Sequence, residues 1–291
     1  MEILTKEQIL QQKVKLNNDV KMPKFGLGTY LITDSLSVYN SVMWSLKNGY
    51  RHIDTAEYYK NEVYIGGAIK DFLEQNPDIK RQDLFITSKV WNNHHKYKDA
   101  KVAIKAIIER LKLDYLDLCL IHWPTKDSFE CWKALEEFYE VGKIKAIGVS
   151  NFNDKQLKKL LKKIKVMPAV NQIETHPGFN QVSTVNFCYK KNITIVSWRT
   201  MLGGQAEHVP LLKELAQKYN TTAAHIALRW AWQLGQVVIP KSTTPERIIN
   251  NPDIGGFELT PAEMLAIEKL PQAALGPHSN DNKFWKGIMI D

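Results

Sequence analysis

The sequence predicts an α/β fold, a (β/α)8 TIM barrel preceded by a short β-hairpin. Two observations lead to this prediction. Short apolar runs alternate with amphipathic stretches over nearly the whole chain, which is the rhythm of parallel strands joined by helices. A polar or aromatic side chain also follows almost every apolar run, and barrels of this kind collect their active sites at the carboxyl ends of the strands.

The size and composition of the chain fit an ordinary soluble globular protein, with either one domain of barrel size or two smaller domains. It has 291 residues, 44% hydrophobic and 24% charged, enough to bury a large core. We expect a single barrel domain over 1–291, with 1–12 as an N-terminal extension and 271–291 as a C-terminal tail near the substrate pocket. No apolar run approaches the roughly 20 residues of a membrane helix, and the N-terminus lacks a signal-peptide pattern.

The few cysteines are scattered, at Cys119, Cys131 and Cys188. This pattern indicates reduced thiols that pack in the interior of a cytoplasmic protein.

The net charge of +8 and the pI near 9.1 raise the question of an anionic partner. Much of the excess lies in 155–165, KQLKKLLKKIK, where Leu157, Leu160, Leu161 and Ile164 recur at helical spacing. A helix that binds membranes or nucleic acid is one interpretation. A solvated helix packed through its leucines is favoured, because no aromatic residues interleave with the lysines and no nucleic-acid signature accompanies them.

The predicted elements follow one another in a regular order. Residues 14–23 alternate around an Asn-Asn-Asp turn and predict the hairpin, 24–30 supply the first barrel strand, and 34–49 have the apolar spacing and final glycine of a helix. The remaining strands are expected at His52–Asp54, Leu84–Lys89, Tyr115–Ile121, Ile144–Ser150, Ala169–Ile173, Ile193–Trp198 and Val237–Pro240. The helical stretches between them are 62–75, 99–111, 129–141, 154–164, 181–191 and 211–233.

An open dinucleotide-binding sheet shares this alternation and is the main alternative. It should show G-x-G-x-x-G after its first strand. Gly26 and Gly28 are followed by no glycine at the required place, and the Gly66-Gly67 pair does not open a helix after a strand. The barrel is therefore favoured.

The stretch 51–62, RHIDTAEYYKNE, suggests a site of proton transfer. A free tyrosine has a pKa of about 10 and is a poor acid at neutral pH unless a cation stabilises its phenolate. Lys89, in FITSKVW, is the candidate cation.

Six segments together resemble the aldo-keto reductase family: YRHIDTAEYYKNE, SKVW, LIHWP, GVSNF, NQIETHP and IPKSTTPERI. They occur in the family's order over almost the whole chain. Within the family, the chain resembles microbial carbonyl and aldehyde reductases and is similar to diketogluconate reductases and prostaglandin F synthase-like members. The resemblance implies a catalytic tetrad of Asp54, Tyr59, Lys89 and His122. We expect Lys89, held by Asp54, to lower the pKa of Tyr59, and His122 to orient the substrate carbonyl as a neutral imidazole.

The resemblance also implies NADPH (NADP+) as the cofactor. Ser150, Asn151 and Gln172 would hydrogen-bond the nicotinamide carboxamide, and Trp198 stands where the family has its stacking aromatic residue. In 241–251, KSTTPERIINN, cationic and hydroxyl groups resemble the family's clamp on the 2′-phosphate and adenosine. The clamp residues are Lys241, Ser242 and Arg247, the adenosine contacts are Thr244 and Asn251, and Thr29 is a further cofactor contact.

An aromatic rim is expected around the substrate, formed by Tyr30, Tyr58, Trp91 and Trp123. It suits a small-molecule aldehyde or ketone. The histidines show no zinc-ligand spacing, so we expect no metal. The family resemblance further implies a monomer, with no nucleic-acid or membrane partner.

Two rival functions remain. Family members that reduce a carbon-carbon double bond in steroids carry glutamate at the position of His122, so the histidine disfavours that activity. A regulatory or structural barrel that binds the cofactor without turnover, like the potassium-channel β subunits, would not need the intact tetrad. The departures from the family pattern, at Val63, 199–202, Asn250 and 273–285, concern cofactor affinity and substrate choice.

Overall fold

The protein, seen as a computed structural model that describes residues 3–276, contains a ring of eight parallel strands. They are β3 (Leu27–Gly28), β4 (His52–Asp54), β5 (Phe85–Val90), β6 (Leu118–Ile121), β7 (Ile147–Ser150), β8 (Val170–Glu174), β9 (Thr194–Trp198) and β10 (Val237–Val238). Each strand pairs in parallel with the next along the chain, and a parallel bridge between Phe25 and Val238 closes the ring. The predicted (β/α)8 barrel is confirmed.

The apolar side chains of β6, β9 and β10 alternate between two hydrophobic clusters. In β6, Leu118 and Leu120 belong to the smaller cluster, which fills the inside of the barrel, whereas Cys119 and Ile121 belong to the larger cluster under the helices. This period of two is the alternation of a pleated strand, and it makes both faces of the sheet apolar. The barrel strands are therefore buried on both faces, and the polar residues within them, such as Ser88 and Asn171, are buried as well.

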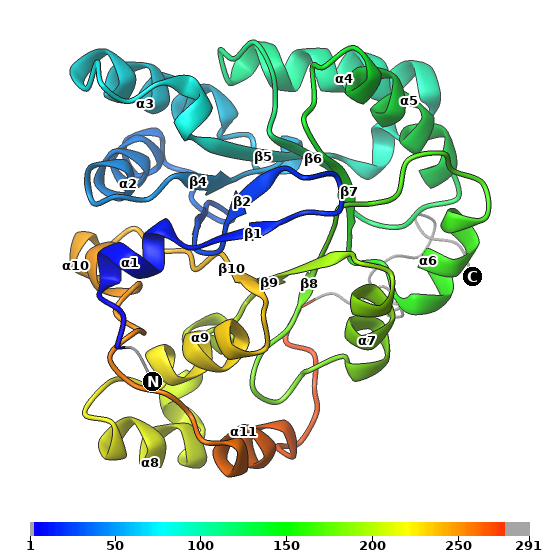
Figure 1. Ribbon diagram of the computed structural model, residues 1–291. Coiled ribbons are helices and arrows are strands. Elements are labelled where there is room, and N and C mark those ends of the chain that lie inside the picture. The colour runs from blue at the N-terminus through cyan, green and yellow to red at the C-terminus, as the bar shows by residue number, and fades with distance from the viewer. Residues whose placement is uncertain (1–2, 277–291) are drawn as a thin grey trace.

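A hairpin of β1 (Lys13–Lys15) and β2 (Lys21–Pro23) lies across the barrel strands, as Figure 1 shows. Asn17 donates through its side-chain amide to the Pro168 carbonyl at 2.8 Å, and Met22 joins the inner cluster. The hairpin therefore covers the amino-terminal end of the barrel, and its prediction is confirmed.

Helices surround the barrel (Figure 1). They are α1 (Lys6–Gln11), α2 (Ser35–Lys47), α3 (Glu62–Gln75), α4 (Tyr97–Arg110), α5 (Ser128–Glu140), α6 (Asp154–Leu161), α7 (Val182–Lys190), α8 (Pro210–Lys218), α9 (Ala223–Gln233), α10 (Pro245–Asn250) and α11 (Pro261–Glu268). The short 3-10 helices are Glu57–Tyr59, Arg81–Asp83, Asn92–His94, Leu202–Gly204 and Ala206–His208. Within the predicted N-terminal extension, α1 buries Ile9 and Leu10 in the main core. Of the predicted tail, 277–291 lie outside the described residues.

The helical stretch predicted over 211–233 is wrong as a single element, because the structure has two helices there, α8 and α9. Asn220 adopts a left-handed φ of 50°, which an α-helix does not permit. The hydroxyl of Thr222 then accepts the backbone N–H of His225 and caps α9. The left-handed residue Asn220 ends the first helix, and the capping Thr222 begins the second, although the apolar pattern in the sequence runs through both.

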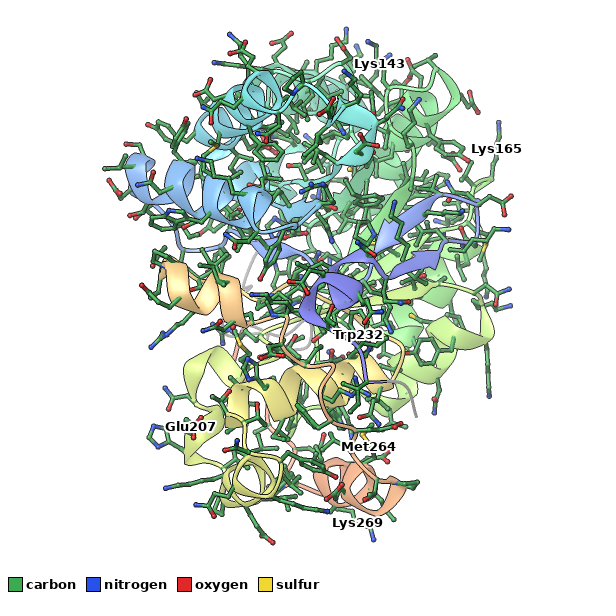
Figure 2. The ribbon with its side chains drawn as sticks, turned by 60° about the vertical axis from the view of Figure 1, so that its left-hand side comes forward. Lys143, Lys165, Glu207, Trp232, Met264 and Lys269 are labelled. Atoms are coloured by element: carbon green, nitrogen blue, oxygen red, sulfur yellow. The ribbon has the colours of Figure 1, made fainter. Side chains whose placement is uncertain are left out.

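The lysine-rich segment forms α6, which ends at Leu161, three residues earlier than predicted. Leu157 and Leu160 are buried, while the lysines of this segment are exposed. Figure 2 shows Lys165, just beyond the helix, pointing outward. The solvated-helix interpretation is therefore supported.

The three cysteines are free and buried, as expected for packing residues. Among residues 3–276, no helix has both the length and the apolar character needed to cross a bilayer.

Candidate active site

The carboxyl ends of the parallel strands bring the predicted catalytic side chains to one rim of the barrel. Asp54 ends β4, Lys89 is the next-to-last residue of β5, and His122 directly follows β6. Neighbouring strands hold these ends in register, since Asp54 pairs with Thr87 and Lys89 pairs with Leu120. Residues far apart in sequence therefore meet because the strands are parallel.

Lys89 and Asp54 form an ion pair inside the barrel. Lys89 Nζ lies 2.6 Å from Asp54 Oδ1, and the two side chains are 1% and 3% exposed. Nζ also donates to the Thr55 carbonyl at 2.8 Å and lies 3.4 Å from Tyr59 Oη. Burial lowers the pKa of Lys89, while the Asp54 carboxylate opposes that change. The ammonium is thus directed at the phenol of Tyr59.

Tyr59 ends the 3-10 helix Glu57–Tyr59, and Lys60 after it takes a left-handed φ of 54° that terminates the turn. Burial, the Asp54 charge and Tyr30 all raise the pKa of Tyr59 well above its ordinary value. The expectation that Lys89 lowers this pKa is therefore wrong for this structure. The physical reason is burial first: the phenol is removed from water, and the nearby Asp54 carboxylate further disfavours a negative charge on its oxygen. Tyr59 consequently keeps its proton at neutral pH.

His122 is buried beside Tyr59, with ring centroids 5.7 Å apart. Burial first, then the charge of Lys89 and a smaller contribution from the neighbouring His95, lowers the pKa of His122 well below its usual range. The direction of this pKa shift agrees with the neutral imidazole that the sequence analysis expects. Its Nδ1 is buried with no hydrogen-bond partner among residues 3–276.

The residues predicted for the nicotinamide are linked to one another by hydrogen bonds. Ser150 Oγ donates to the Gln172 carbonyl at 2.8 Å, and Asn151 Nδ2 donates to Ser150 Oγ at 3.0 Å and to the His122 carbonyl at 3.0 Å. Trp198 Nε1 donates to Asn151 Oδ1 at 2.9 Å. Asn151 adopts a left-handed φ of 64°, a conformation that asparagine tolerates better than most residues. The half-buried indole is therefore held beside a strip of amide and hydroxyl groups.

Gln172 also reaches the catalytic pair, a contact that the sequence did not reveal. Its Nε2 donates to Asp54 Oδ2 at 2.7 Å, so the carboxylate is held on both oxygens. The predicted cofactor and catalytic groups thus form one connected network.

The comparison with known families agrees with this geometry. Residues 25–272 match the profile described as the aldo/keto reductase family. The chain belongs to the aldo-keto reductase family. It is an oxidoreductase, and the resemblance stated from its motifs is confirmed.

This aldo-keto reductase is 43% identical over 277 residues to the glyoxal reductase of Bacillus subtilis, covering 94% of this chain and 99% of that protein. It is 42% identical over 263 residues to the 9,11-endoperoxide prostaglandin H2 reductase of Trypanosoma cruzi, covering 88% of this chain and 90% of the relative. The crystal structure of an aldo-keto reductase from a Medee basin deep-sea metagenome library superposes with a TM-score of 0.87 at 38% identity, covering 92% of this chain and 98% of that one.

The segment predicted to hold the cofactor phosphate follows β10 in this aldo-keto reductase. Lys241 lies at the rim beside β3, since a Cβ on Gly28 would approach its Cβ to 3.9 Å. Ser242 Oγ accepts the backbone N–H of Thr244 at 3.0 Å, and Thr244 precedes the first residue of α10. Arg247 is exposed on that helix. Asn251, directly after the helix, is buried.

Thr29 lies where β3 meets β4. Its hydroxyl donates to the Asp54 carbonyl at 2.9 Å. This bond ties the predicted cofactor contact to the strand that carries the catalytic acid.

The aromatic residues predicted for the substrate pocket surround the catalytic rings. Tyr58 stacks on Trp91 at 4.0 Å between centroids, and Tyr30 lies 5.0 Å from Tyr59. Tyr30 and Tyr58 are 42% and 49% exposed, as expected for the outer part of a mouth. Trp123 follows His122 directly and is almost fully buried, so its place in the pocket wall stays a prediction.

Glu57 is a site residue that the sequence reading missed. One of its carboxylate oxygens accepts the Trp91 backbone N–H at 2.8 Å and the other lies 2.7 Å from His94 Nδ1. It therefore fixes the loop that carries the aromatic wall. Its only signal in the sequence is its position two residues before Tyr59.

Asn61 was missed in the same way. Its side chain accepts the Thr55 hydroxyl at 2.7 Å and donates to the Thr29 carbonyl at 3.0 Å. It joins the loop after β4 to the loop after β3.

Proposed function

We propose that the protein is an NADPH-dependent reductase of small aldehydes and dicarbonyls, with Tyr59 as the proton donor. The observation that supports this most directly is the position of Lys89 Nζ, 2.6 Å from Asp54 and 3.4 Å from the Tyr59 phenol. An ammonium in that position stabilises a phenolate as the proton leaves. His122 beside it offers the N–H of a neutral imidazole to a carbonyl oxygen.

The residues in the mechanism have distinct tasks. A bound reduced nicotinamide would supply the hydride that adds to the carbonyl carbon. Tyr59, whose raised pKa keeps its proton in place until then, donates that proton to the carbonyl oxygen. Lys89 stabilises the resulting phenolate, which recovers a proton from solvent. His122 orients the carbonyl by hydrogen bonding.

The side chains at the ends of β7, β8 and β9 fit a nicotinamide. An amide donor and acceptor at Asn151 lie beside a flat, half-exposed indole at Trp198. We propose that Ser150, Asn151 and Gln172 hold the carboxamide and that Trp198 stacks on the ring. The indole bonded to Asn151 presents a fixed face, which limits the ring to one orientation.

NADPH is proposed over NADH because of the charges after β10. Lys241, beside the rim, and Arg247, on α10, are exposed cations, and Ser242 adds a hydroxyl. A 2′-phosphate carries two negative charges and several acceptor oxygens, which these groups can match through charge-assisted hydrogen bonds. Thr244, Asn251 and Thr29 complete the proposed contacts.

The proposed substrates are small carbonyl compounds. One curated relative is named a glyoxal reductase, and it is 43% identical to this chain. The half-exposed rings of Tyr30 and Tyr58 leave the mouth open beside the Tyr59 hydroxyl. We also propose that the protein acts in the cytoplasm, in agreement with its three free thiols. We further propose that it is a monomer, which size-exclusion chromatography at micromolar concentration tests.

The function is tested by following NADPH absorbance with glyoxal, methylglyoxal and larger aldehydes. Tyr59→Phe should lower kcat by about 10²–10⁴-fold while NADPH binding stays near that of the wild type. Tyr64→Phe is the matched control, since it removes the hydroxyl of an exposed tyrosine on α3 that lies outside the proposed site. Undiminished turnover by Tyr59→Phe would show that Tyr59 is not the proton donor. NADPH binding without turnover of any carbonyl would instead indicate a regulatory barrel.

A further inference from the structure

Glu174, the last residue of β8, carries a carboxylate that the proposed mechanism does not use. Its side chain is 1% exposed. Oε1 accepts the backbone N–H groups of Leu275 and Gly276, both at 3.0 Å, and Oε2 lies 3.3 Å from the Gly276 nitrogen. His176 Nε2 lies 3.5 Å from Oε1. Hydrogen bonds to a charged acceptor are stronger than neutral ones, so Glu174 holds the backbone at 275–276 firmly.

The chain after α11 returns across the carboxyl end of the barrel. Figure 1 shows this red segment running from α11 back toward β8. The Ala273 N–H donates to the Gly178 carbonyl at 2.7 Å, and the Asn180 N–H donates to Gln272 Oε1 at 2.8 Å. The segment is therefore attached to the loop after β8 before it reaches Glu174.

Gly276 lies against the indole of Trp198. A Cβ on Gly276 would lie 2.8 Å from Trp198 Cη2 and 3.0 Å from Cζ3, and 3.2 Å from Arg199 Nη1. These distances are shorter than van der Waals contact, so glycine is needed for the backbone to approach this closely. The backbone at Gly276 thus borders the outer edge of the six-membered ring.

The opposite side of the same indole is also held. Trp198 Nε1 donates to Asn151 Oδ1 at 2.9 Å. Glu174 and Trp198 are register partners on neighbouring strands, so the carboxylate and the indole lie at the same level of the barrel. The ring is therefore fixed between Asn151 on one side and the Glu174-bound backbone on the other.

We propose that Glu174 is a positioning residue for cofactor binding. By holding residues 275–276 against Trp198, its carboxylate sets the angle of the indole face that receives the nicotinamide. This inference rests on the proposed function of Trp198. Glu174 touches neither substrate nor cofactor, and it acts only through the backbone of Gly276.

Three variants separate the parts of this arrangement. Glu174→Ala removes the carboxylate, whereas Glu174→Gln keeps an acceptor oxygen and the side-chain size but loses the charge. Gly276→Ala leaves Glu174 intact and pushes the added methyl group into the Trp198 ring. Gly256→Ala is the matched control, because a Cβ there meets no atom within 4 Å.

Two measurements are made on the full chain, after the melting temperature has shown that each variant is folded. The first is the Trp198 contribution to the fluorescence of the free protein, obtained by subtracting the spectrum of Trp198→Phe; Glu174→Ala and Gly276→Ala should change it. The second is the Kd for NADPH from the fluorescence of the nicotinamide. Glu174→Ala and Gly276→Ala should raise that Kd about tenfold, and Glu174→Gln about threefold, with kcat less affected.

The outcomes are distinguishable. Wild-type protein that binds no NADPH would refute the proposed function, and the Trp198 fluorescence would still test the placement of the indole. Wild-type protein that binds NADPH, with folded Glu174 and Gly276 variants that match its Kd and its Trp198 signal, would overturn the positioning role. The same would follow if Gly256→Ala weakened NADPH binding as much as Gly276→Ala.

Discussion

The ammonium of Lys89 is shared unequally, lying 2.6 Å from Asp54 Oδ1 and 3.4 Å from Tyr59 Oη. The shorter contact makes the Asp54 carboxylate the closer partner of the Lys89 ammonium. The phenol of Tyr59, at the longer distance, stays protonated until it transfers its proton to the substrate and its oxygen becomes negatively charged. This unequal division is consistent with a tyrosine that donates a proton rather than one that accepts it.

Lys89→Met should unfold more easily than the wild type, by about 3–5 kcal/mol, because it leaves the Asp54 carboxylate buried without its cation. Adding Asp54→Leu should restore much of the stability, since two apolar side chains then replace the pair. Neither the single nor the double variant should turn over substrate. Urea unfolding and NADPH consumption measure the two effects. A double variant no more stable than Lys89→Met would contradict the account of the pair.

Buried histidines should make the protein acid-sensitive. Burial lowers the pKa of His52 and of His95 to about 4, below the value near 6.5 of the unfolded chain. The unfolded chain therefore binds protons first as the pH falls. Each such histidine should lower the free energy of unfolding by up to ~1.4 kcal/mol per pH unit between pH 6.5 and about 4.

Urea midpoints at pH 7, 6 and 5 test this. His95→Gln should reduce the dependence of the free energy of unfolding on pH by the contribution of one buried histidine, up to ~1.4 kcal/mol per pH unit. The control is His208→Gln, because His208 is exposed and lies outside the candidate site. Equal slopes for His95→Gln and the wild type would show that the buried imidazole is protonated in the native state.

Two adjacent glycines in α3 should respond oppositely to alanine. A Cβ on Gly67 meets no atom within 4 Å, so Gly67→Ala should stabilise the protein by up to ~1 kcal/mol through helix propensity. A Cβ on Gly66 would lie 2.5 Å from the Leu111 carbonyl oxygen, so Gly66→Ala should destabilise it by about 1–3 kcal/mol. Thermal melting of both variants gives the comparison. A shift of the same sign in both would refute the close packing of α3 on Leu111.

Arg247→Ala should weaken NADPH binding about 10–100-fold and leave NADH binding nearly unchanged. A guanidinium that pairs with the 2′-phosphate contributes only when that phosphate is present. Fluorescence titration with each cofactor measures the difference. Lys162→Ala, which removes an exposed cation beyond α6, controls for net charge. Equal losses for NADPH and NADH would assign Arg247 a structural role instead.

Much of the fold was readable because it depends on local patterns. Runs such as 84–89 and 169–173 are recognisable as strands because they are short and rich in branched or aromatic apolar residues, and the polar residues within them are buried too. The amphipathic stretch 62–75 coincides with α3 from Glu62 to Gln75. The break at Asn220 escaped prediction, since it depends on one left-handed residue within an otherwise helical pattern.

The sequence by itself determined which side chains meet at the rim. Asp54, Lys89 and His122 each end an apolar run, and parallel strands carry such ends to the same side of a barrel. Only the tertiary structure decided how these groups act on one another. The raised pKa of Tyr59, the bond from Gln172 to Asp54 and the contact of Glu174 with Gly276 depend on distance and burial between segments far apart in the chain. Spacing along a sequence does not specify those quantities, because fractions of an ångström and the exclusion of water control them.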